Sequence, residues 1–365
     1  MASTCTAEAA GAYRIEVAQL PTDVTARHDQ LVRRLLAGDP SIDLLSLDSS
    51  FTAELAAAEL LTPVPQAKVA QYGEGVAPAA LAAATYGGRL VAAPWFFDPQ
   101  VLWYRGNIAE RAGLDTRKPI SWDDLVAGAE RLGVTVQIED RDGSGISEWV
   151  SALVAGAGGS ILDGSGRGAT VGLDTTAGRA AASVVEFYRQ AGVGPGPSAE
   201  ALREFAAPGG GFLLASTSAI SDPTVAAVQA DMSAAAYPVV GDASIAPLAG
   251  VALAVPSAAP TPDLSFRAID CLTSAPVLEQ LMTGPQHAAS RLSTFDAEDV
   301  ASSFRSADVA RAALESGATV PSTPYWSRIV GALDETWLPI SGVGQDGTPE
   351  SSQNAVEAVV QGRLP

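Results

Sequence analysis

The hydrophobic and polar positions of the first sixty residues follow two alternating periodicities. Residues 13–19 alternate apolar with polar side chains and residues 42–47 form a short apolar run, so both segments predict strands. Residues 24–37 and 52–61 instead place apolar side chains on one helical face, and each segment ends near glycine or proline. Strands that alternate with helices over short connections are typical of an α/β unit with a parallel sheet.

Residues 89–105 predict a strand, a corner punctuated by proline, and a second strand rich in β-branched and aromatic residues. The corner contains Trp95, Phe96, Phe97 and Asp98, which combine the apolar wall and the polar anchor that a ligand cavity needs. The same side chains also suit a plain hydrophobic core with Asp98 as a turn acid. The residues alone leave both interpretations open.

The remaining pattern indicates a second α/β domain over about 115–245. Ser121, with an acid three residues later, is expected to cap a helix that ends near Leu132. A strand at 134–138 leads into a polar loop at 139–149, which is rich in glycine but lacks the lysine of a phosphate-binding loop. A helix is expected to follow this loop and to end at 158–159. The other expected segments are a hairpin or loop at 160–175, strands at 212–216, 235–240 and 248–255, and helices at 107–113, 176–191, 198–206, 223–231, 263–273, 274 onward, 326–337 and 349–361.

Length and composition predict a soluble globular chain of two domains. The 365 residues are 47% hydrophobic, but no apolar run is long enough to span a bilayer. The 22 basic and 41 acidic residues give a net charge of −19, and the sequence contains no cluster of lysine and arginine. Because such a surface repels phosphate backbones, we do not expect nucleic acid as a partner.

Residues suited to catalysis are sparse. His28 and His287 are the only imidazoles, and neither lies in a motif for a nucleophile, a metal or a dinucleotide. Asp48 follows the strand at 42–47, where ligands bind in parallel sheets, but it also suits the N-cap of the next helix. A glycosidase needs two carboxylates in its cleft, and Asp48 with Asp98 is the only pair that we can nominate. We therefore expect no enzyme, no cofactor and no metal site.

The two cysteines, Cys5 and Cys271, leave the cellular compartment open. They lack the spacing of a zinc site, and taken alone they favour two free buried thiols. A single long-range disulfide would instead imply an oxidising compartment. The first residues have neither the charged region nor the apolar region of a signal peptide. The protein is then either cytoplasmic or separated from its leader.

Eight stretches, in the same order, resemble the extracytoplasmic solute-binding proteins of ATP-driven importers, the sugar-binding group that includes maltose-binding protein. The resemblance is greatest to the trehalose-binding lipoproteins of actinobacterial sugar importers. Each stretch is weak by itself, but the ordered set covers nearly the whole chain. The stretches are LPTD at 20–23, QLVRRLL at 30–36, SIDLLSLDSSFTAE at 41–54, APWFFDPQVLWYR at 93–105, SWDDL at 121–125, GGSIL at 158–162, AIDCLTS at 268–274 and PSTPYWS at 321–327.

The resemblance implies the two-lobe α/β fold of type II periplasmic binding proteins, with a ligand cleft between lobes joined by crossover strands. The N-terminal lobe would comprise 1–105 and about 250–320, and the C-terminal lobe about 106–249 and about 321–365. Hinge crossings are expected near 94–106 and 247–255. Relatives carry cysteines that match Cys5 and Cys271, so the resemblance also implies a disulfide between an N-terminal helix and a later one.

The resemblance also assigns ligand-binding residues. Asp48 and Phe51 match an aspartate and a cleft aromatic, and Asp98 matches a ligand-binding Asn or Glu. Trp149 lies in the segment that lines the second lobe. Aromatic rings stack on the apolar faces of sugars, and carboxylates hold hydroxyl groups by charge-assisted hydrogen bonds. The full expected set is Asp48, Phe51, Trp95, Phe97, Asp98, Trp149, Tyr325 and Trp326.

Several positions depart from the pattern of the trehalose binders. Ser144 and Ser151 stand where relatives carry Glu and Asn, and Val320 replaces a basic residue. Residues 249–252 read AGVA in place of Gly-Gly-Trp-Asn, and the tryptophan usual after 212–216 is missing. The first strand of relatives is also missing, and the last helix is expected to be short. A site that reads hydroxyl groups tolerates lost partners poorly, so these departures argue against assuming trehalose.

The function implied is that of a substrate-binding protein without catalytic activity. It would bind a small saccharide, such as a disaccharide like trehalose or a related polyol, and deliver it to the transmembrane subunits of an ABC permease. It would act as a monomer outside the cytoplasmic membrane, lipid-anchored in its precursor. The alternatives are a carbohydrate-active enzyme that uses Asp48 and Asp98, and a degenerate binding protein that acts as a sensor or scaffold.

Overall fold

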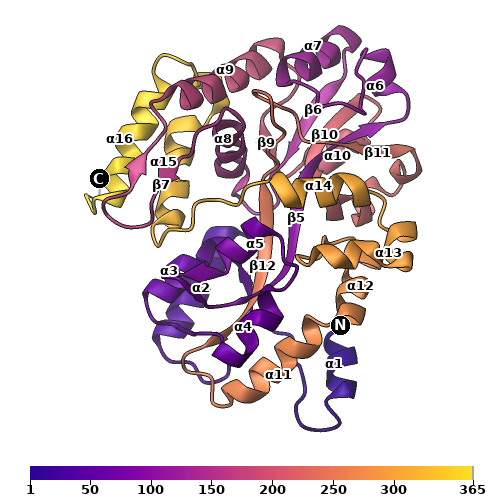
Figure 1. Cartoon of the computed structure of the whole chain (residues 1–365). Helices are drawn as coiled ribbons and strands as arrows, with labels where there is room; N and C mark the ends of the chain where they lie inside the picture. The colour runs from indigo at the N-terminus through magenta and orange to yellow at the C-terminus, as the bar shows by residue number, and fades with distance from the viewer. Residues whose placement is uncertain (364–365) are drawn as a thin grey trace.

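One mixed sheet runs through the computed structural model, which describes residues 1–363 (Figure 1). Residues 364 and 365, with which the predicted second lobe ends, lie outside the described part. The strand order is β1-β12-β5-β10-β6-β9, with β2 beside β12 and β11 beside β5. The strands are β1 Leu45–Asp48, β2 Leu61–Thr62, β5 Ala93–Arg105, β6 Thr135–Glu139, β9 Pro197–Ser198, β10 Gly210–Ser216, β11 Met232–Ala235 and β12 Leu248–Pro256.

The sheet is only partly parallel. β6 pairs in parallel with β10 and β9, whereas β1, β12, β5, β10 and β11 meet one another antiparallel. The parallel sheet predicted for the first sixty residues is therefore wrong, because β1 pairs with β12 from much later in the chain. Two small hairpins lie outside this sheet, β3 Thr85–Tyr86 with β4 Arg89–Leu90 and β7 Leu162–Asp163 with β8 Thr170–Val171.

β5 is a single strand of 13 residues, not the predicted strand, corner and strand. Its first half pairs with β12, and its second half pairs with β10 and β11. The two prolines that led to the prediction of a corner disrupt little of the strand pairing between β5 and β12. Pro94 lies where the register with β12 shifts, and Pro99 lies where that ladder ends. Proline is tolerated in strands at such irregular or terminal positions.

Most long helices lie within two residues of their predicted bounds. The cap predicted for α7 is confirmed, since Ser121 Oγ accepts a hydrogen bond of 3.0 Å from Asp124 N. None of the helices in residues 1–363 combines the length and apolar character of a membrane span. The helices are α1 Ala2–Glu8, α2 Val24–Leu36, α3 Thr52–Ala57, α4 Gln66–Gly73, α5 Pro78–Ala83, α6 Ile108–Arg111, α7 Trp122–Leu132, α8 Gly145–Gly156, α9 Thr176–Ala191, α10 Ala201–Ala206, α11 Pro262–Leu272, α12 Ala275–Thr283, α13 Glu298–Ser303, α14 Ala307–Ser316, α15 Trp326–Trp337 and α16 Thr348–Val360.

Two predicted elements do not form, and the strand predicted at 235–240 lies instead at Met232–Ala235. Residues 13–19 have no strand partner, and Val17 is 72% exposed, so their alternation covers no core. Residues 223–231 form two short 3-10 turns in place of a helix. Val225 and Val228 are three residues apart and pack into the same cluster, a spacing that a 3-10 turn satisfies. The sequence patterns also miss α4, α5, α13 and α14.

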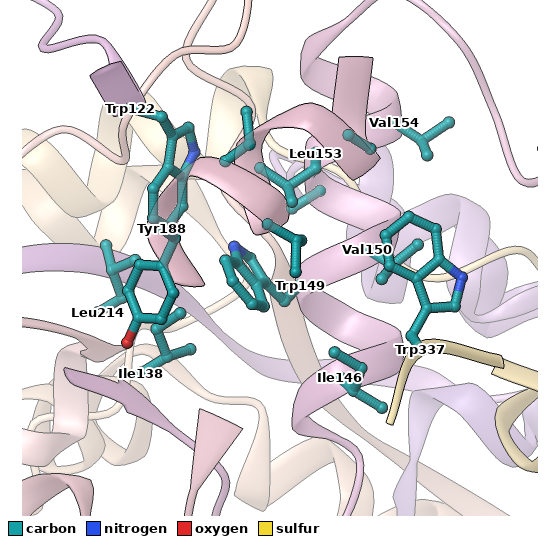
Figure 2. Packing of buried hydrophobic residues seen from close by; sticks show 14 of the residues in the cluster. Trp122, Ile138, Ile146, Trp149, Val150, Leu153, Val154, Tyr188, Leu214 and Trp337 are labelled. Atoms are coloured by element: carbon teal, nitrogen blue, oxygen red, sulfur yellow. The ribbon is translucent and has the colours of Figure 1, made fainter. Parts of the chain in front are cut away.

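Two large hydrophobic clusters lie at opposite ends of β5 and β12. The first draws its buried side chains from segments within 5–93 and 252–277. The second draws them from segments within 102–246 and 326–360. Figure 2 shows Trp149 inside the second cluster, between Trp122 with Tyr188 on one side and Trp337 on the other. Two smaller clusters include Phe97 and Trp103, so β5 contributes buried side chains to all four clusters.

The two cysteines form a disulfide. Cys5 in α1 is bonded to Cys271 in α11, 266 positions later in the sequence. This bond confirms the pairing that the resemblance implied and corrects the interpretation as two free thiols. Because Cys5 is the only buried residue of the seven in α1, the bond is the main attachment of that helix.

Gly250 in β12 is expected to be intolerant of any side chain. A Cβ there would lie 2.0 Å from the ring of Phe97, which is fully buried opposite it. We expect Gly250→Ala to lower the free energy of unfolding by about 1–2 kcal/mol through overpacking. The matched control is Gly331→Ala in α15, where the Cβ meets open space and alanine favours the helix. Urea denaturation of both variants checks this, and equal effects would contradict it.

Candidate functional site

A cavity of about 580 Å³ lies between the two clusters, and we call it the central cavity. Its walls come from the start of α2, the residues after β1, the middle of β5, the first half of β12, the loop at 139–148, and the start of α15. Most of these elements are distant in sequence, and the crossing strands bring them together. The volume is within the range of small-molecule sites.

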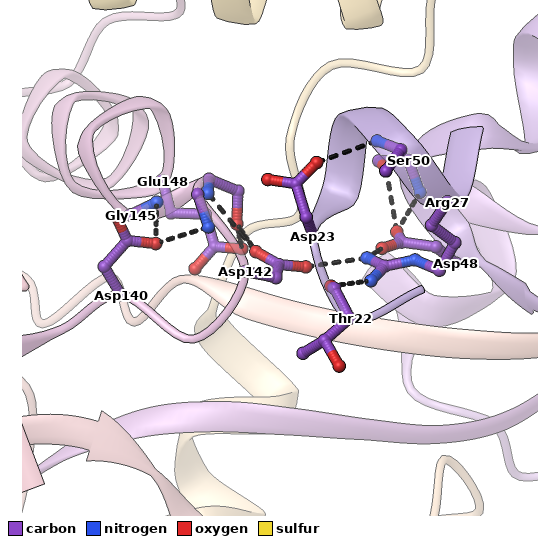
Figure 3. Close-up of polar contacts among 12 residues, drawn as sticks. Thr22, Asp23, Arg27, Asp48, Ser50, Asp140, Asp142, Gly145 and Glu148 are labelled. Atoms are coloured by element: carbon purple, nitrogen blue, oxygen red, sulfur yellow. Dashed lines mark hydrogen bonds and ion pairs between the residues drawn. The ribbon is translucent and has the colours of Figure 1, made fainter. Parts of the chain in front are cut away.

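Arg27 in α2 joins two carboxylates from opposite walls of the central cavity. Its Nη2 lies 3.2 Å from Asp48 Oδ2 and 2.7 Å from Asp142 Oδ2 (Figure 3). Asp48 belongs to β1 beside the first cluster, and Asp142 follows β6 beside the second. The backbone N–H of Val24 also donates to the carbonyl of Asp142 at 2.8 Å. We call these contacts the arginine bridge.

The loop at 139–148 is shaped to present Asp142 to α2. Asp140 Oδ1 accepts hydrogen bonds from the N–H groups of Gly143 and Gly145 at 2.8 and 3.1 Å. Gly143 has a φ of +94°, which side chains rarely adopt, and a Cβ on Gly145 would lie 2.8 Å from Asp140 Cβ. The two glycines are therefore required for this turn, and they explain the glycine-rich pattern without a phosphate.

Glu148, in the first turn of α8, lies at the inner wall of the central cavity. Its Oε1 lies 3.0 Å from Ser144 Oγ, and its Oε2 accepts from Gln100 Nε2 at 3.2 Å. Burial, together with the carboxylates of Asp142, Asp48 and Glu139, raises the pKa of Glu148 to about 8.

The hydroxyl of Ser144 links Glu148 to Asp142. Ser144 Oγ lies 2.6 Å from Asp142 Oδ1 but carries only one proton. With Glu148 protonated, its O–H donates to Ser144, which donates to Asp142. With Glu148 ionised, Ser144 can serve only one of the two carboxylates. The hydrogen-bond geometry therefore agrees with the raised pKa of Glu148.

Asp98 is one of the cavity residues predicted from sequence, but protein groups occupy its carboxylate. It is 4% exposed, its Oδ2 lies 2.5 Å from His287 Nδ1, and its Oδ1 accepts from Ala288 N at 2.7 Å and from Thr217 Oγ1 at 3.3 Å. Phe96 stacks on His287 with ring centroids 4.3 Å apart. Asp98 thus fixes the ring of His287, whose second nitrogen stays available at the cavity wall.

A second contact joins the walls on the side of α15. Glu54 Oε2 in α3 accepts from Ser327 Oγ in α15 at 2.8 Å and lies 2.9 Å from His28 Nε2 in α2. The hydrogen bond to Glu54 raises the pKa of His28. His28 also packs edge-on against Phe51, with ring centroids 5.1 Å apart. Segments that lie beside the two clusters therefore contact each other at two separate places.

Four of the eight residues predicted from sequence line the central cavity, namely Asp48, Phe51, Asp98 and Trp326. The expected N-cap role of Asp48 is also present, since its Oδ1 accepts from Ser50 N at 3.0 Å. These two roles do not exclude each other. Whether the four side chains contact a ligand stays a prediction.

The other four predicted residues lie outside the cavity wall. Phe97 and Trp149 are 0% and 1% exposed in hydrophobic clusters. Trp95 packs against the first cluster and donates its ring N–H to the Leu272 carbonyl at 3.0 Å. Tyr325 packs against the second cluster, one residue before α15. Alternation along β5 explains Trp95 and Phe97, because neighbouring side chains of a strand face opposite sides.

Sequence reasoning missed the residues that join the walls. Arg27 and Asp142 are 115 positions apart and belong to no motif. Glu148 lies within the polar loop predicted at 139–149, whereas the structure places it in the first turn of α8. No sequence motif surrounds His287, so the local pattern does not indicate a role in a site. Their roles depend on neighbours that the local pattern does not reveal.

Comparison with known proteins identifies related sequences. Residues 8–278 match the family model of the bacterial extracellular solute-binding proteins. A "Probable ABC transporter-binding protein" of Deinococcus radiodurans is 27% identical over 169 residues. That match covers 42% of this chain and 38% of the relative, so the alignment spans well under half of the relative's length.

Solved structures share the fold over almost the whole chain. Maltose-bound MalE3 of T. maritima superposes with a TM-score of 0.82 at 20% identity, covering 97% of this chain and 95% of that one. The sugar-binding protein MalE of Xanthomonas citri gives 0.82 at 18%, covering 99% and 95%. The GacH receptor of Streptomyces glaucescens gives 0.80 at 17%, covering 99% and 93%. The chain therefore has the expected two-lobe α/β fold of type II periplasmic binding proteins.

Proposed function

Because this chain belongs to the bacterial extracellular solute-binding proteins, we propose that it is the substrate-binding component of an ABC importer. In this proposal it binds a small saccharide in the central cavity and hands it to the transmembrane subunits of a permease, without chemical change. The observation that carries the proposal is the position of the cavity, which is built from two cores joined by crossing strands. A ligand held there contacts both cores at once.

We propose the lobe division expected from sequence, with crossings at β5 and β12. The distribution of the two clusters supports it, since their buried residues separate near 93–102 and 246–252. The arginine bridge and the contact between Glu54 and Ser327 would then hold the lobes in a closed arrangement. Ligand binding stabilises such an arrangement when it makes contacts that the open form cannot make.

The chemistry of the cavity wall suits a polyhydroxylated ligand. Phe51, Phe96 and Trp326 provide aromatic surface, and carboxylates and His287 provide polar groups. Among the structural neighbours, MalE3 is bound to maltose and GacH forms a complex with acarbose. Trehalose and related polyols, suggested by the sequence resemblance, remain specific candidates within this class.

No specific observation favours an enzyme. Asp48 accepts from Ser50 and Arg27, and Asp98 accepts from three protein groups, so neither carboxylate is left free for acid or base chemistry. We propose that the protein acts as a monomer on the outer side of the cytoplasmic membrane, lipid-anchored in its precursor. The family and the disulfide support an extracytoplasmic location.

A thermal-shift panel of monosaccharides, disaccharides and polyols, including maltose and trehalose, tests the proposal. A ligand that binds only the folded protein raises the melting temperature with concentration. We expect at least one saccharide to do so, with an unchanged ligand recovered after heating. No shift across the panel would contradict saccharide binding, and recovery of a cleaved sugar would support the enzyme instead.

The arginine bridge is expected to increase the affinity of the protein for its ligand. Arg27→Gln removes the charge between Asp48 and Asp142, so the closed arrangement would bring two carboxylates together without a cation. We expect affinity for the panel's best ligand to fall at least about tenfold, measured by calorimetry. The control is Arg33→Gln on the exposed side of α2, which should leave affinity unchanged. Equal affinities for both variants would contradict a closing role for Arg27.

A further inference from the structure

The wall of the central cavity has more acidic than basic side chains. Its wall contains seven carboxylates but only three guanidinium groups. Neutral sugars need hydrogen-bond acceptors, but they do not need so many charges. The carboxylates belong to Asp29, Asp48, Glu54, Asp98, Glu139, Asp142 and Glu148, and the guanidinium groups to Arg27, Arg141 and Arg328.

Most of these carboxylates already have a basic partner. Arg27 serves Asp48 and Asp142, and Arg141 Nη2 lies 2.9 Å from Glu139 Oε1. His28 and His287 lie against Glu54 and Asp98. Glu148 is different, because within residues 1–363 its only hydrogen-bond partners are the uncharged side chains of Ser144 and Gln100.

Gln100, which lies beside Glu148, has a buried oxygen atom without a hydrogen-bond partner in the described chain. It is 6% exposed, lines the central cavity, and uses its Nε2 for Glu148. Its Oε1 is buried and has no hydrogen-bond donor in the described chain. A buried acceptor left without a donor is costly, so a missing donor is expected near it. A carboxyl group without a cationic partner and an unpaired amide oxygen therefore lie together at one wall.

We propose that the ligand of the central cavity is a saccharide that carries a protonated amine, placed beside Glu148 and Gln100. This inference rests on the proposed saccharide-binding function and narrows it. An ammonium group has three donors and no acceptor, so it matches an acceptor set that a hydroxyl group fills only in part. Without a ligand Glu148 is mostly protonated at neutral pH, so an ammonium group beside it would favour the ionised form by supplying the positive charge that residues 1–363 do not provide there. Charge-assisted hydrogen bonds of this kind are the stronger ones.

The space around Glu148 allows such a group. Glu148 also lines a second cavity of about 190 Å³, together with Ser151, Leu248 and Val320. Because Glu148 belongs to both walls, an amine or its small substituent can occupy the junction while the sugar ring stays in the central cavity. The aromatic walls at Phe51 and Trp326 remain free to stack on the ring.

Matched ligands that differ only in charge test the proposal. We would titrate the protein by calorimetry at pH 6.5 with glucosamine and its β-1,4-linked disaccharide, and with the N-acetylated form of each. Maltose serves as a sugar without nitrogen. We expect at least one free amine to bind at least about tenfold more tightly than its acetylated form. Raising the salt concentration should reduce that preference, because it screens the ion pair.

Two variants test whether the preference for the free amine depends on Glu148 in the cavity wall. Glu148→Gln keeps the shape of the side chain but removes its charge, and it should abolish the preference for the free amine. Glu130→Gln, on the exposed face of α7, should retain it. Neutral sugars that bind as well as or better than amines would overturn the inference but leave saccharide binding intact. A preference that survives in Glu148→Gln would overturn the role of Glu148, and binding of no saccharide at all would overturn the proposed function as well.

Discussion

Replacing Cys5 and Cys271 together by serine is expected to lower the free energy of unfolding by about 3–5 kcal/mol. The disulfide joins residues 266 positions apart, so it closes a loop that contains most of the chain. Such a loop restricts the unfolded chain far more than the folded one, and the stabilisation grows with loop length. The effect should appear in urea denaturation as a lower midpoint.

A reducing agent, which breaks the disulfide in the wild-type protein, provides the control. Dithiothreitol should lower the stability of the wild-type protein but leave the double serine variant unchanged. The structure adds a constraint, because α1 buries only Cys5 and so depends on the bond for its place. If the variant released α1 to protease while its denaturation midpoint stayed at the wild-type value, the predicted global stabilisation would be wrong.

Glu148→Gln is expected to raise the free energy of unfolding by about 2–3 kcal/mol at pH 7. The pKa of Glu148 is raised from an ordinary value near 4.5 to about 8, mainly by burial and then by neighbouring carboxylates. Between these two values the folded protein holds a proton that the unfolded chain has lost. Glu148 therefore reduces stability progressively as the pH rises from about 4.5 to about 8, and glutamine removes that loss.

The pH dependence distinguishes this effect from better packing. The stability difference between Glu148→Gln and wild type should be small near pH 4, grow through neutral pH, and become constant above pH 8. Glu130→Gln, an exposed acid on α7, should show no such trend. A difference of the same size at pH 4 and pH 8 would contradict the raised pKa.

According to the two predictions, Glu148 lowers the free energy of unfolding at neutral pH and contributes to ligand binding. The glutamine variant should be more stable at neutral pH, yet it should lose the preference for a charged ligand. Binding sites commonly hold residues that the fold alone would not select. This combination would be hard to explain if Glu148 were only part of the packing of α8.

Elements with strong local signals were predictable from the sequence. α7 carries an N-cap serine, an amphipathic face and a glycine in the left-handed conformation just after its end, and each acts within a few residues. β5 was not predictable, because Pro94 and Pro99 locally indicate a break. Three strands from distant parts of the chain hold it straight across both cores.

The candidate site was likewise predictable from the sequence only in part. The resemblance to a family led to Asp48, Phe51 and Trp326, all of which line the cavity. Local pattern did not reveal which aromatic side chains of β5 turn inward, because that depends on where the strand lies between its neighbours. It also did not reveal that partner groups from Thr217 and 287–288 occupy the carboxylate of Asp98.

The sequence by itself determined the family, the amphipathic helices and the two-lobe plan, because these depend on periodicity and on ordered local motifs. Only the tertiary structure decided that β5 is one strand, that Arg27 meets Asp142 across 115 positions, and that within residues 1–363 the carboxyl group of Glu148 has only uncharged hydrogen-bond partners. The reason is physical. Burial, charge and hydrogen-bond partners are set by neighbours in space, and those neighbours come from segments that are far apart along the chain.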